Sequence, residues 1–192
     1  MVSAIAELRR ATWPLHQQLE KRIDIKTRFT DSGAYRTHLE KMWGFCAAIE
    51  RRLGEDAFGP ALADYARRRK VPLLTRDLIA LGATPESVRC LPACDSLPDC
   101  QDPASAFGCL YVLEGATLGG RTLLPLVQKR LGLTADNGAA FLASYGDDVG
   151  PMWRDFGASL DAWCATEQRR VSASRTAIGT FASLADWLCG NP

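Results

Sequence analysis

The sequence predicts an all-α fold, and two observations carry this prediction. Apolar residues recur at three- and four-residue steps over long stretches, the pattern of helices with one face turned to a core. No segment shows the alternating, valine-rich pattern of strands. The chain has 192 residues, enough for a full hydrophobic core but short for two. We therefore expect a multi-helix bundle that forms one domain over residues 1–192.

The first helix is predicted over residues 3–23. Pro14 lies inside it, and because proline removes one backbone donor, we expect a bend just before His16. The apolar face of this helix consists of Ile5, Leu8, Thr12, Leu15, Leu19 and Ile23.

The later helices follow from the same periodicity and from capping residues. Asp31 or Ser32 can cap the second helix, and Gly54 can end it. Pro103 suits the first turn of the longest helix, and Pro125 predicts a kink in it. The other predicted ranges are about 57–70, 75–81, 103–131, 137–145 and 148–188 with breaks, with a separation at Val71-Pro72 and a loop from Cys90 to Pro103.

The composition excludes several classes of partner. Lys and Arg number 23 against 22 Asp and Glu, so no basic field favours nucleic acid or an anionic membrane. No apolar run approaches the roughly 20 residues of a membrane span, and the N-terminus starts no signal-peptide pattern. We therefore expect a cytoplasmic protein. Its seven cysteines are an odd number without paired C-x-x-C spacing, which favours reduced thiols over a zinc site.

Glycine is frequent inside the longest predicted helix. Gly108, Gly115, Gly119 and Gly120 interrupt it, and each costs about 1 kcal/mol relative to alanine. The first three recur at steps that place them on nearly one face, with Tyr111 between them. A strip of bare backbone can approach a flat ligand or pack closely against another helix. The spacing leaves both interpretations open.

His16 lies one helical turn before Glu20 on the first helix. A carboxylate at that position can accept a hydrogen bond from the imidazole, as one usually does from a metal-bound histidine. The same pair is also common on solvated helix faces. The other histidine, His38, flanks the apolar face of the second helix and is expected at the surface or the boundary, without a role as ligand.

Two stretches of the chain together resemble the heme oxygenase family. Leu8-Arg9-Arg10-Ala11-Thr12, followed by His16 and Glu20, is similar to the proximal helix of that family. Tyr111-Val112-Leu113-Glu114-Gly115-Ala116-Thr117-Leu118-Gly119-Gly120 resembles its distal helix, most closely in the bacterial branch. A looser similarity covers residues 42–50, and the chain length and helix order agree from end to end.

The resemblance implies that heme is both cofactor and substrate. His16 is the expected axial iron ligand, oriented by Glu20, and the backbone of Gly115 and Gly119 is expected to pack against the other heme face, where O2 binds. Tyr111 belongs to the same expected heme contacts. The implied reaction cleaves heme to biliverdin, CO and iron, with electrons from an external reductase or ferredoxin. A biliverdin-using photoreceptor is a further candidate partner.

One position departs from the family pattern. Many members carry an aspartate directly after the first distal glycine, whereas this chain has Ala116. Related bacterial sequences have serine there, which suggests that backbone groups and ordered water organise the distal side. Thr117, Glu114 and Arg121 are candidate substitutes, although each is as easily a core or surface residue.

The heme propionates need cations near the pocket mouth. Arg9, two turns before His16, matches the basic position of the family's first helix, and arginine can bind a carboxylate with two parallel bonds. Arg154 is a second candidate, for which an ordinary solvated charge is the favoured interpretation.

Two rival functions remain. A protein of the same fold can store, sense or carry heme without degrading it, and Ala116 favours this alternative. In the second rival, the glycines only pack helices and His16 faces solvent.

Overall fold

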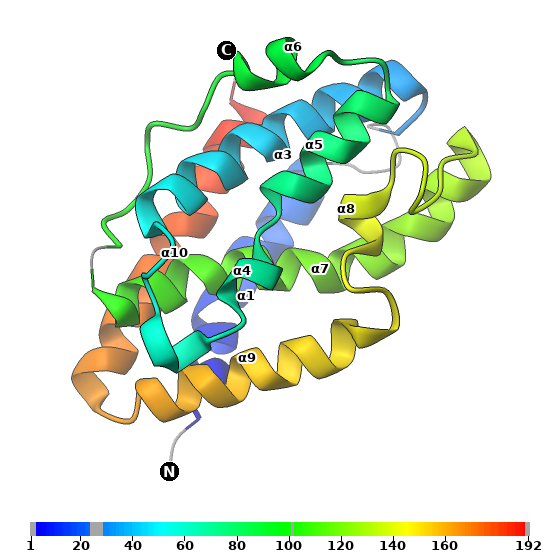
Figure 1. Ribbon diagram of the computed structural model, residues 1–192. Helices are drawn as coiled ribbons and strands as arrows, with labels where there is room; N and C mark the ends of the chain where they lie inside the picture. Colours follow the sequence, from blue (N-terminus) through cyan, green and yellow to red (C-terminus); the bar gives the residue numbers. More distant parts are fainter. Residues whose placement is uncertain (1–2, 24–28, 101, 191–192) are drawn as a thin grey trace.

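The computed structural model describes residues 3–23, 29–100 and 102–190 (Figure 1). These residues form helices, with isolated bridges near Thr134 and no strand among them. The all-α prediction is therefore confirmed. The elements are α1 (Ala4–Ile23), α3 (Ser32–Leu53), η1 (Gly59–Leu62), α4 (Tyr65–Arg68), α5 (Val71–Ala80), α6 (Pro85–Arg89), α7 (Pro103–Leu131), α8 (Ala140–Ala143), η2 (Gly146–Asp148), α9 (Val149–Trp163) and α10 (Glu167–Cys189).

Helix α1 agrees with its prediction. Its buried residues include Leu8, Thr12 and Leu19 from the expected apolar face, and Pro14 lies within the helix. Asp161 on α9 accepts hydrogen bonds from the Ser3 hydroxyl and from the backbone of the first turn. An acidic side chain at a helix N-terminus satisfies free amides and complements the helix dipole. The N-terminal end of α1 is thereby fixed to α9.

Helix α3 begins and ends where its capping residues predict. The Asp31 side chain accepts a hydrogen bond from the Ala34 amide, and Gly54 follows the last turn with a positive φ of 66°. A residue without a side chain adopts that backbone conformation at low cost. Almost every residue from Met42 to Glu50 is buried. The helix is therefore surrounded by protein along its second half, next to α5 and α10 (Figure 1).

Helices α7 and α10 form the centre of the fold. The Asp102 side chain caps α7, which runs to Gly132 and contains Pro125 as predicted. The first half of α7 is continuously buried. Helix α10 makes the most extensive contact with α7, and α3, α8 and α9 also contact it. Helix α1 packs mainly on α10.

The structure differs from the prediction at four places in the middle of the chain. The expected helix over 57–70 is two short pieces, η1 and α4, and α6 was missed. Val71-Pro72 does not separate helices but starts α5, since a proline in the first turn gives up an amide that has no partner within the helix anyway. The helix expected over 137–145 is reduced to the four residues of α8. The break predicted within 148–188 lies between α9 and α10.

Three of the cysteines lie in the interior of the helical bundle. Cys46, Cys109 and Cys164 are buried, as expected for small apolar side chains. No helix among the described residues is long and apolar enough to cross a membrane.

Candidate functional site

The imidazole of His16 is partly uncovered on α1. Its side chain is 43% exposed, while the Nδ1 atom itself is buried and has no hydrogen-bond partner. Glu20 lies one turn further, with its carboxylate 3.7 Å from Nδ1. This distance is within ion-pair range but too long for a hydrogen bond. His16 and Glu20 are thus close, as predicted, but they form no hydrogen bond.

Two aromatic rings contact His16. Trp13 stacks on it, with centroids 5.8 Å apart and planes 7° apart, and Phe181 of α10 meets it edge-on at 6.0 Å. Trp13 is itself 48% exposed, which is unusual for so large an apolar side chain. The sequence reasoning gave Trp13 no role, although it precedes His16 by three residues and so shares its helix face.

The four glycines of α7 fall into two pairs. A Cβ on Gly115 or Gly119 would meet no atom within 4 Å. A Cβ on Gly108 would lie 2.3 Å from the Ala173 carbonyl oxygen of α10, and one on Gly120 would lie 2.5 Å from the Leu142 carbonyl oxygen of α8. Of the two interpretations that the spacing left open, close helix packing applies at Gly108 and Gly120, whereas the backbone is open at Gly115 and Gly119.

A contact between Thr12 and Tyr111 joins the two helices that carry these features. The hydroxyl oxygens lie 3.5 Å apart, and both residues are buried. His16 follows Thr12 by one turn of α1, and Gly115 follows Tyr111 by one turn of α7. Tyr111 also packs against Trp153 of α9, with ring centroids 5.7 Å apart. It thus fixes α7 relative to α1 and α9 just before the open glycines.

Thr117, Glu114 and Arg121 were the candidate substitutes for the missing distal carboxylate, and two of them already interact within the protein. Ala116 is half-buried, and Arg121 is exposed. Thr117 is buried and donates its hydroxyl proton to the Glu114 carbonyl oxygen at 2.6 Å. The Glu114 carboxylate is fully buried among cations. The hydroxyl proton of Thr117 and the carboxylate of Glu114 are thus both engaged within the protein.

The two candidate propionate ligands have different surroundings. Arg9 is exposed and lines a shallow hollow of about 360 Å³ with Ala6, Arg10 and Trp13. This hollow therefore shares Trp13 with the surroundings of His16. Arg154 is exposed on α9, near Gly150 on its own helix.

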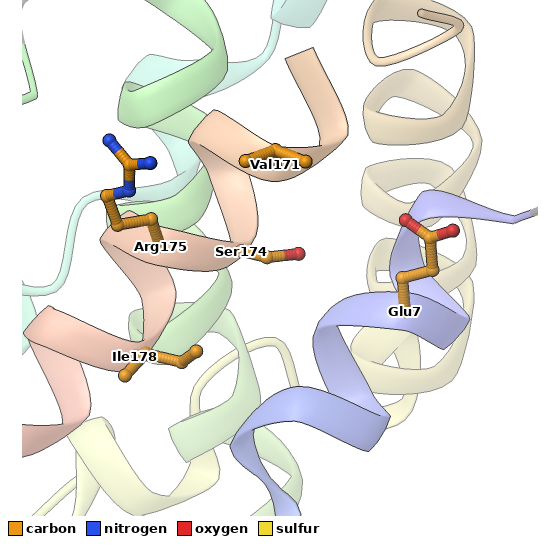
Figure 2. A pocket seen from close by; sticks show the side chains of 5 residues that line it. All are labelled: Glu7, Val171, Ser174, Arg175 and Ile178. Carbon is orange, nitrogen blue, oxygen red and sulfur yellow. The ribbon is translucent and has the colours of Figure 1, made fainter. Parts of the chain in front are cut away.

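A second hollow lies between α1 and α10 (Figure 2). It contains none of the predicted site residues; its lining is Glu7, Val171, Ser174, Arg175 and Ile178. His38, expected at the surface or the boundary, is instead buried against the edge of Phe29.

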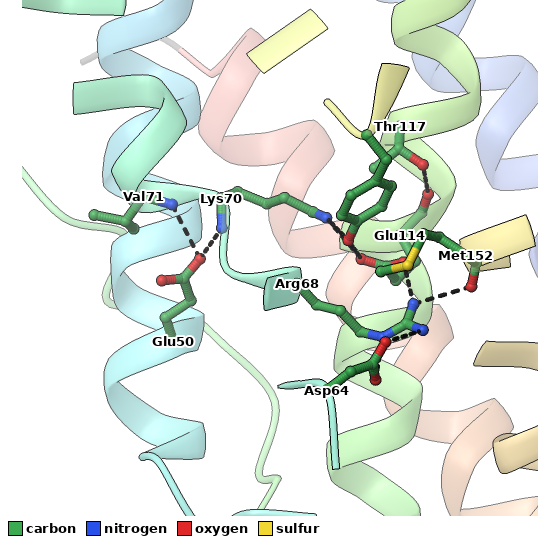
Figure 3. Close-up of polar contacts among 9 residues, drawn as sticks. Glu50, Asp64, Arg68, Lys70, Val71, Glu114, Thr117 and Met152 are labelled. Carbon is green, nitrogen blue, oxygen red and sulfur yellow. Dashed lines mark hydrogen bonds and ion pairs between the residues drawn. The ribbon is translucent and has the colours of Figure 1, made fainter. Parts of the chain in front are cut away.

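A buried charged cluster behind α7 was not predicted (Figure 3). Arg68 and Lys70 bind the two carboxylate oxygens of Glu114 at 2.8 and 2.6 Å. Glu114 follows an uninterrupted apolar run, Leu110 to Leu113. A carboxylate in such a run signals a buried partner, because burying an unpaired charge is costly. The sequence does not identify the partner, since both cations lie more than 40 positions away in the chain.

An uncovered imidazole on α1 and two uncovered glycines on α7 could hold a flat, wide ligand. The space beside the backbone of Gly115 and Gly119 is open, so a ligand can approach that backbone closely. His16 offers a ring nitrogen to a metal. The fold and these positions define an all-helical protein with a candidate cofactor site between its first helix and its longest helix.

The comparisons with known proteins identify the family. The heme oxygenase family model matches residues 2–189, so the chain belongs to the heme oxygenase family. A heme oxygenase from Xanthomonas campestris pv. campestris is 29% identical over 155 residues, which cover 79% of this chain and 87% of that protein.

Solved structures show the same fold. The NO- and CO-bound heme oxygenase of Neisseria meningitidis has a TM-score of 0.84 at 23% identity, covering 98% of this chain and 91% of that one. Heme oxygenase from Leptospira interrogans has a TM-score of 0.81 at 17% identity, covering 99% and 100%. Heme oxygenase 2 of Chlamydomonas reinhardtii, solved without heme, has a TM-score of 0.79 at 16% identity, covering 100% and 98%.

Proposed function

We propose that this protein is a heme oxygenase that cleaves heme to biliverdin, CO and iron. The observation that carries the proposal is the combination of an uncovered His16 on α1 with an open backbone at Gly115 and Gly119 on α7, in a chain of the heme oxygenase family. Bound heme supplies the iron that activates O2 and is also the molecule that is oxidised. The protein supplies binding, orientation and the exclusion of water.

Each site residue has a distinct task in this proposal. His16 ligates the iron, and Trp13 and Phe181 limit the rotation of its ring. Gly115 and Gly119 would let the α7 backbone lie close to the heme, since a side chain at either position would occupy the space of the ligand.

The edge of the site needs a cation for the propionates. Arg9 is the better candidate, because it shares its hollow with Trp13, which stacks on His16. Arg154 remains the second candidate. Tyr111 contributes through its contact with α1, where the Thr12 hydroxyl oxygen lies 3.5 Å from that of Tyr111.

Hemin titration tests the binding step. We expect the wild-type protein to develop a sharp Soret band at one equivalent of hemin, and His16→Ala to lose it. The chain has only two histidines, so His38→Asn is the matched control and should keep the band. A wild-type spectrum that equals that of free hemin would overturn the proposal.

Heme binding without turnover is the second candidate function. It is favoured by Ala116, which offers no polar group, and by the engagement of Thr117 and Glu114 within the protein. Reduction of the heme complex in air, with ascorbate or a reductase, distinguishes the two functions. Release of CO and formation of biliverdin support the oxygenase, whereas intact heme supports the carrier or sensor.

Four features of the biology of this protein stay predictions. These are the external reductase or ferredoxin, the biliverdin-using photoreceptor, the cytoplasmic location and the organisation of residues 1–192 as one domain.

A further inference from the structure

The buried cluster behind α7 joins four side chains, Arg68, Lys70, Glu114 and Tyr145, here called the Glu114 cluster. The Lys70 ammonium donates to Glu114 Oε1 at 2.6 Å and to the Tyr145 hydroxyl oxygen at 2.6 Å. The Tyr145 hydroxyl donates to the same Glu114 oxygen at 2.7 Å. Arg68 donates to Glu114 Oε2 at 2.8 Å. Both carboxylate oxygens are therefore fixed, and only one orientation of Glu114 satisfies all donors.

The charges of the cluster are balanced within the protein. Arg68 also forms two hydrogen bonds with Asp64, at 2.7 and 2.8 Å, and so has a second carboxylate of its own. Lys70 has Glu114 as its acidic partner in these bonds. Burial lowers the pKa of Lys70, and Glu114 opposes this effect. Apolar side chains of similar volume often stabilise a core as well as such a cluster does, so its distinctive contribution is a fixed geometry.

The cluster is anchored to the rest of the fold through α5. Glu50 of α3 accepts hydrogen bonds from the backbone amides of Lys70 and Val71, at the N-terminus of α5 (Figure 3). It also binds the Arg69 guanidinium at 3.0 Å. The backbone from which Lys70 extends toward α7 is thus held by a buried carboxylate.

The cluster lies at one end of the open glycine segment. Glu114 directly precedes Gly115, and its carbonyl oxygen accepts the Thr117 hydroxyl at 2.6 Å. At the other end, Gly120 packs closely against α8, where a Cβ on Gly120 would lie 2.5 Å from the Leu142 carbonyl oxygen. The segment between these two points has glycines with no atoms beside their Cβ positions. Helices that contain glycine bend easily, so their orientation depends on what holds the ends.

We propose that Glu114 and Lys70 are positioning residues that, together with Tyr145, fix the rotation of α7 and thereby direct the backbone of Gly115 and Gly119 toward the heme. This inference rests on the proposed function, because it assigns a task at the heme site. It differs from a role in stability alone, since it predicts effects on the bound heme when the stability of the fold is preserved.

The charge-neutral double variant Lys70→Met/Glu114→Gln is the main test. It removes one positive and one negative charge and leaves Arg68 with Asp64. We expect its melting temperature to stay within about 5 °C of the wild type. In the hemin-free protein, amide hydrogen exchange at residues 115–120 should rise by about tenfold, as local opening becomes easier. In the hemin complex, the midpoint of the alkaline Soret transition should shift by about 0.5 pH unit or more, because that midpoint reports the distal surroundings of the iron.

Tyr145→Phe and Asp148→Asn complete the design. Tyr145→Phe keeps both charges and loses one hydrogen bond to Glu114. It tests the positioning role if the double variant fails to fold. We expect smaller changes in exchange and in the Soret midpoint, in the same direction. Asp148→Asn is the matched control, because it breaks an exposed ion pair with Arg67 at 2.8 Å, three residues after Tyr145.

The outcomes separate the two proposals. The positioning role would be overturned if the double variant showed wild-type exchange and a wild-type Soret transition. If the double variant does not fold, the same result in Tyr145→Phe would overturn it. Equal changes in Asp148→Asn would overturn it too. If the wild-type protein binds no hemin, the proposed function fails, and the exchange experiment alone still tests whether the cluster holds α7.

Discussion

Trp13 stacks on His16 in a nearly parallel arrangement, with the ring centroids 5.8 Å apart. This contact restrains an imidazole that has no hydrogen bond at Nδ1. We expect Trp13→Ala to weaken hemin binding by about tenfold, through the loss of an aromatic contact and of ring orientation. Because Trp13 is 48% exposed, the melting temperature of the hemin-free protein should change little. Ile79→Ala on α5 is the control, because it removes a comparably exposed apolar side chain, and it should leave the hemin affinity unchanged. An unchanged hemin affinity in Trp13→Ala would contradict the role of the stacking contact.

Gly115→Ala and Gly108→Ala should have opposite effects. A methyl group on Gly115 enters open space, so we expect the hemin-free protein to gain up to about 1 kcal/mol of stability from helix propensity, while hemin affinity falls. A methyl group on Gly108 collides with the Ala173 carbonyl, which should lower the free energy of unfolding by about 1–3 kcal/mol. Urea unfolding and hemin titration measure both. Equal destabilisation by the two substitutions would show that Gly115 is also covered.

Arg9→Gln and Arg154→Gln distinguish the two propionate candidates. Arg9 lines the hollow that includes Trp13, whereas Arg154 is exposed on α9. We expect Arg9→Gln to weaken hemin binding by about three- to tenfold, the range for loss of a charge-assisted hydrogen bond at an exposed site. Arg154→Gln should bind as the wild type does, and the reverse order would reassign the role to Arg154. Competition with a hemin-binding reporter protein provides the affinities.

Asp77→Ala should destabilise the fold strongly. The Asp77 carboxylate is buried on α5 and accepts hydrogen bonds from the Ala140 and Phe141 amides at 2.7 and 2.8 Å, so it holds the N-terminus of α8. Loss of both acceptors leaves two buried amides unsatisfied, and we expect a cost of about 2–4 kcal/mol in urea unfolding. Asp136→Ala, which breaks an exposed ion pair with Arg76, is the control and should show no measurable change. A small effect in Asp77→Ala would mean that α8 is held by its apolar contacts alone.

The tyrosines should titrate only as the protein unfolds. The chain has four, and burial raises the pKa of each one: Tyr35, Tyr65, Tyr111 and Tyr145. The folded protein therefore holds these protons more tightly than the unfolded chain does, so this contribution to stability is complete below about pH 10 and is lost as the pH rises above it. Alkaline titration of tyrosinate absorbance, followed together with circular dichroism, measures this. A phenolate signal near pH 10 in protein that is still helical would contradict the buried placement.

The long helices could be predicted because their signals are local. The periodic apolar face of α1, the Asp31 and Gly54 caps of α3 and the Asp102-Pro103 start of α7 all lie within a few residues of the backbone they control. The start of α5 was mispredicted for the opposite reason. Its N-terminus is satisfied by Glu50, which lies on a different helix about 20 positions earlier in the chain.

The sequence by itself determined the helices, the place of His16 on the first of them and the glycine pattern of the longest. Only the tertiary structure decided which glycines are open, because packed helices touch over a limited length. Helix α10 covers α7 at Gly108 and leaves Gly115 free on nearly the same face. The partners of Glu114 were likewise decided by the fold, since periodicity shows that a side chain is buried but not which distant cation reaches it.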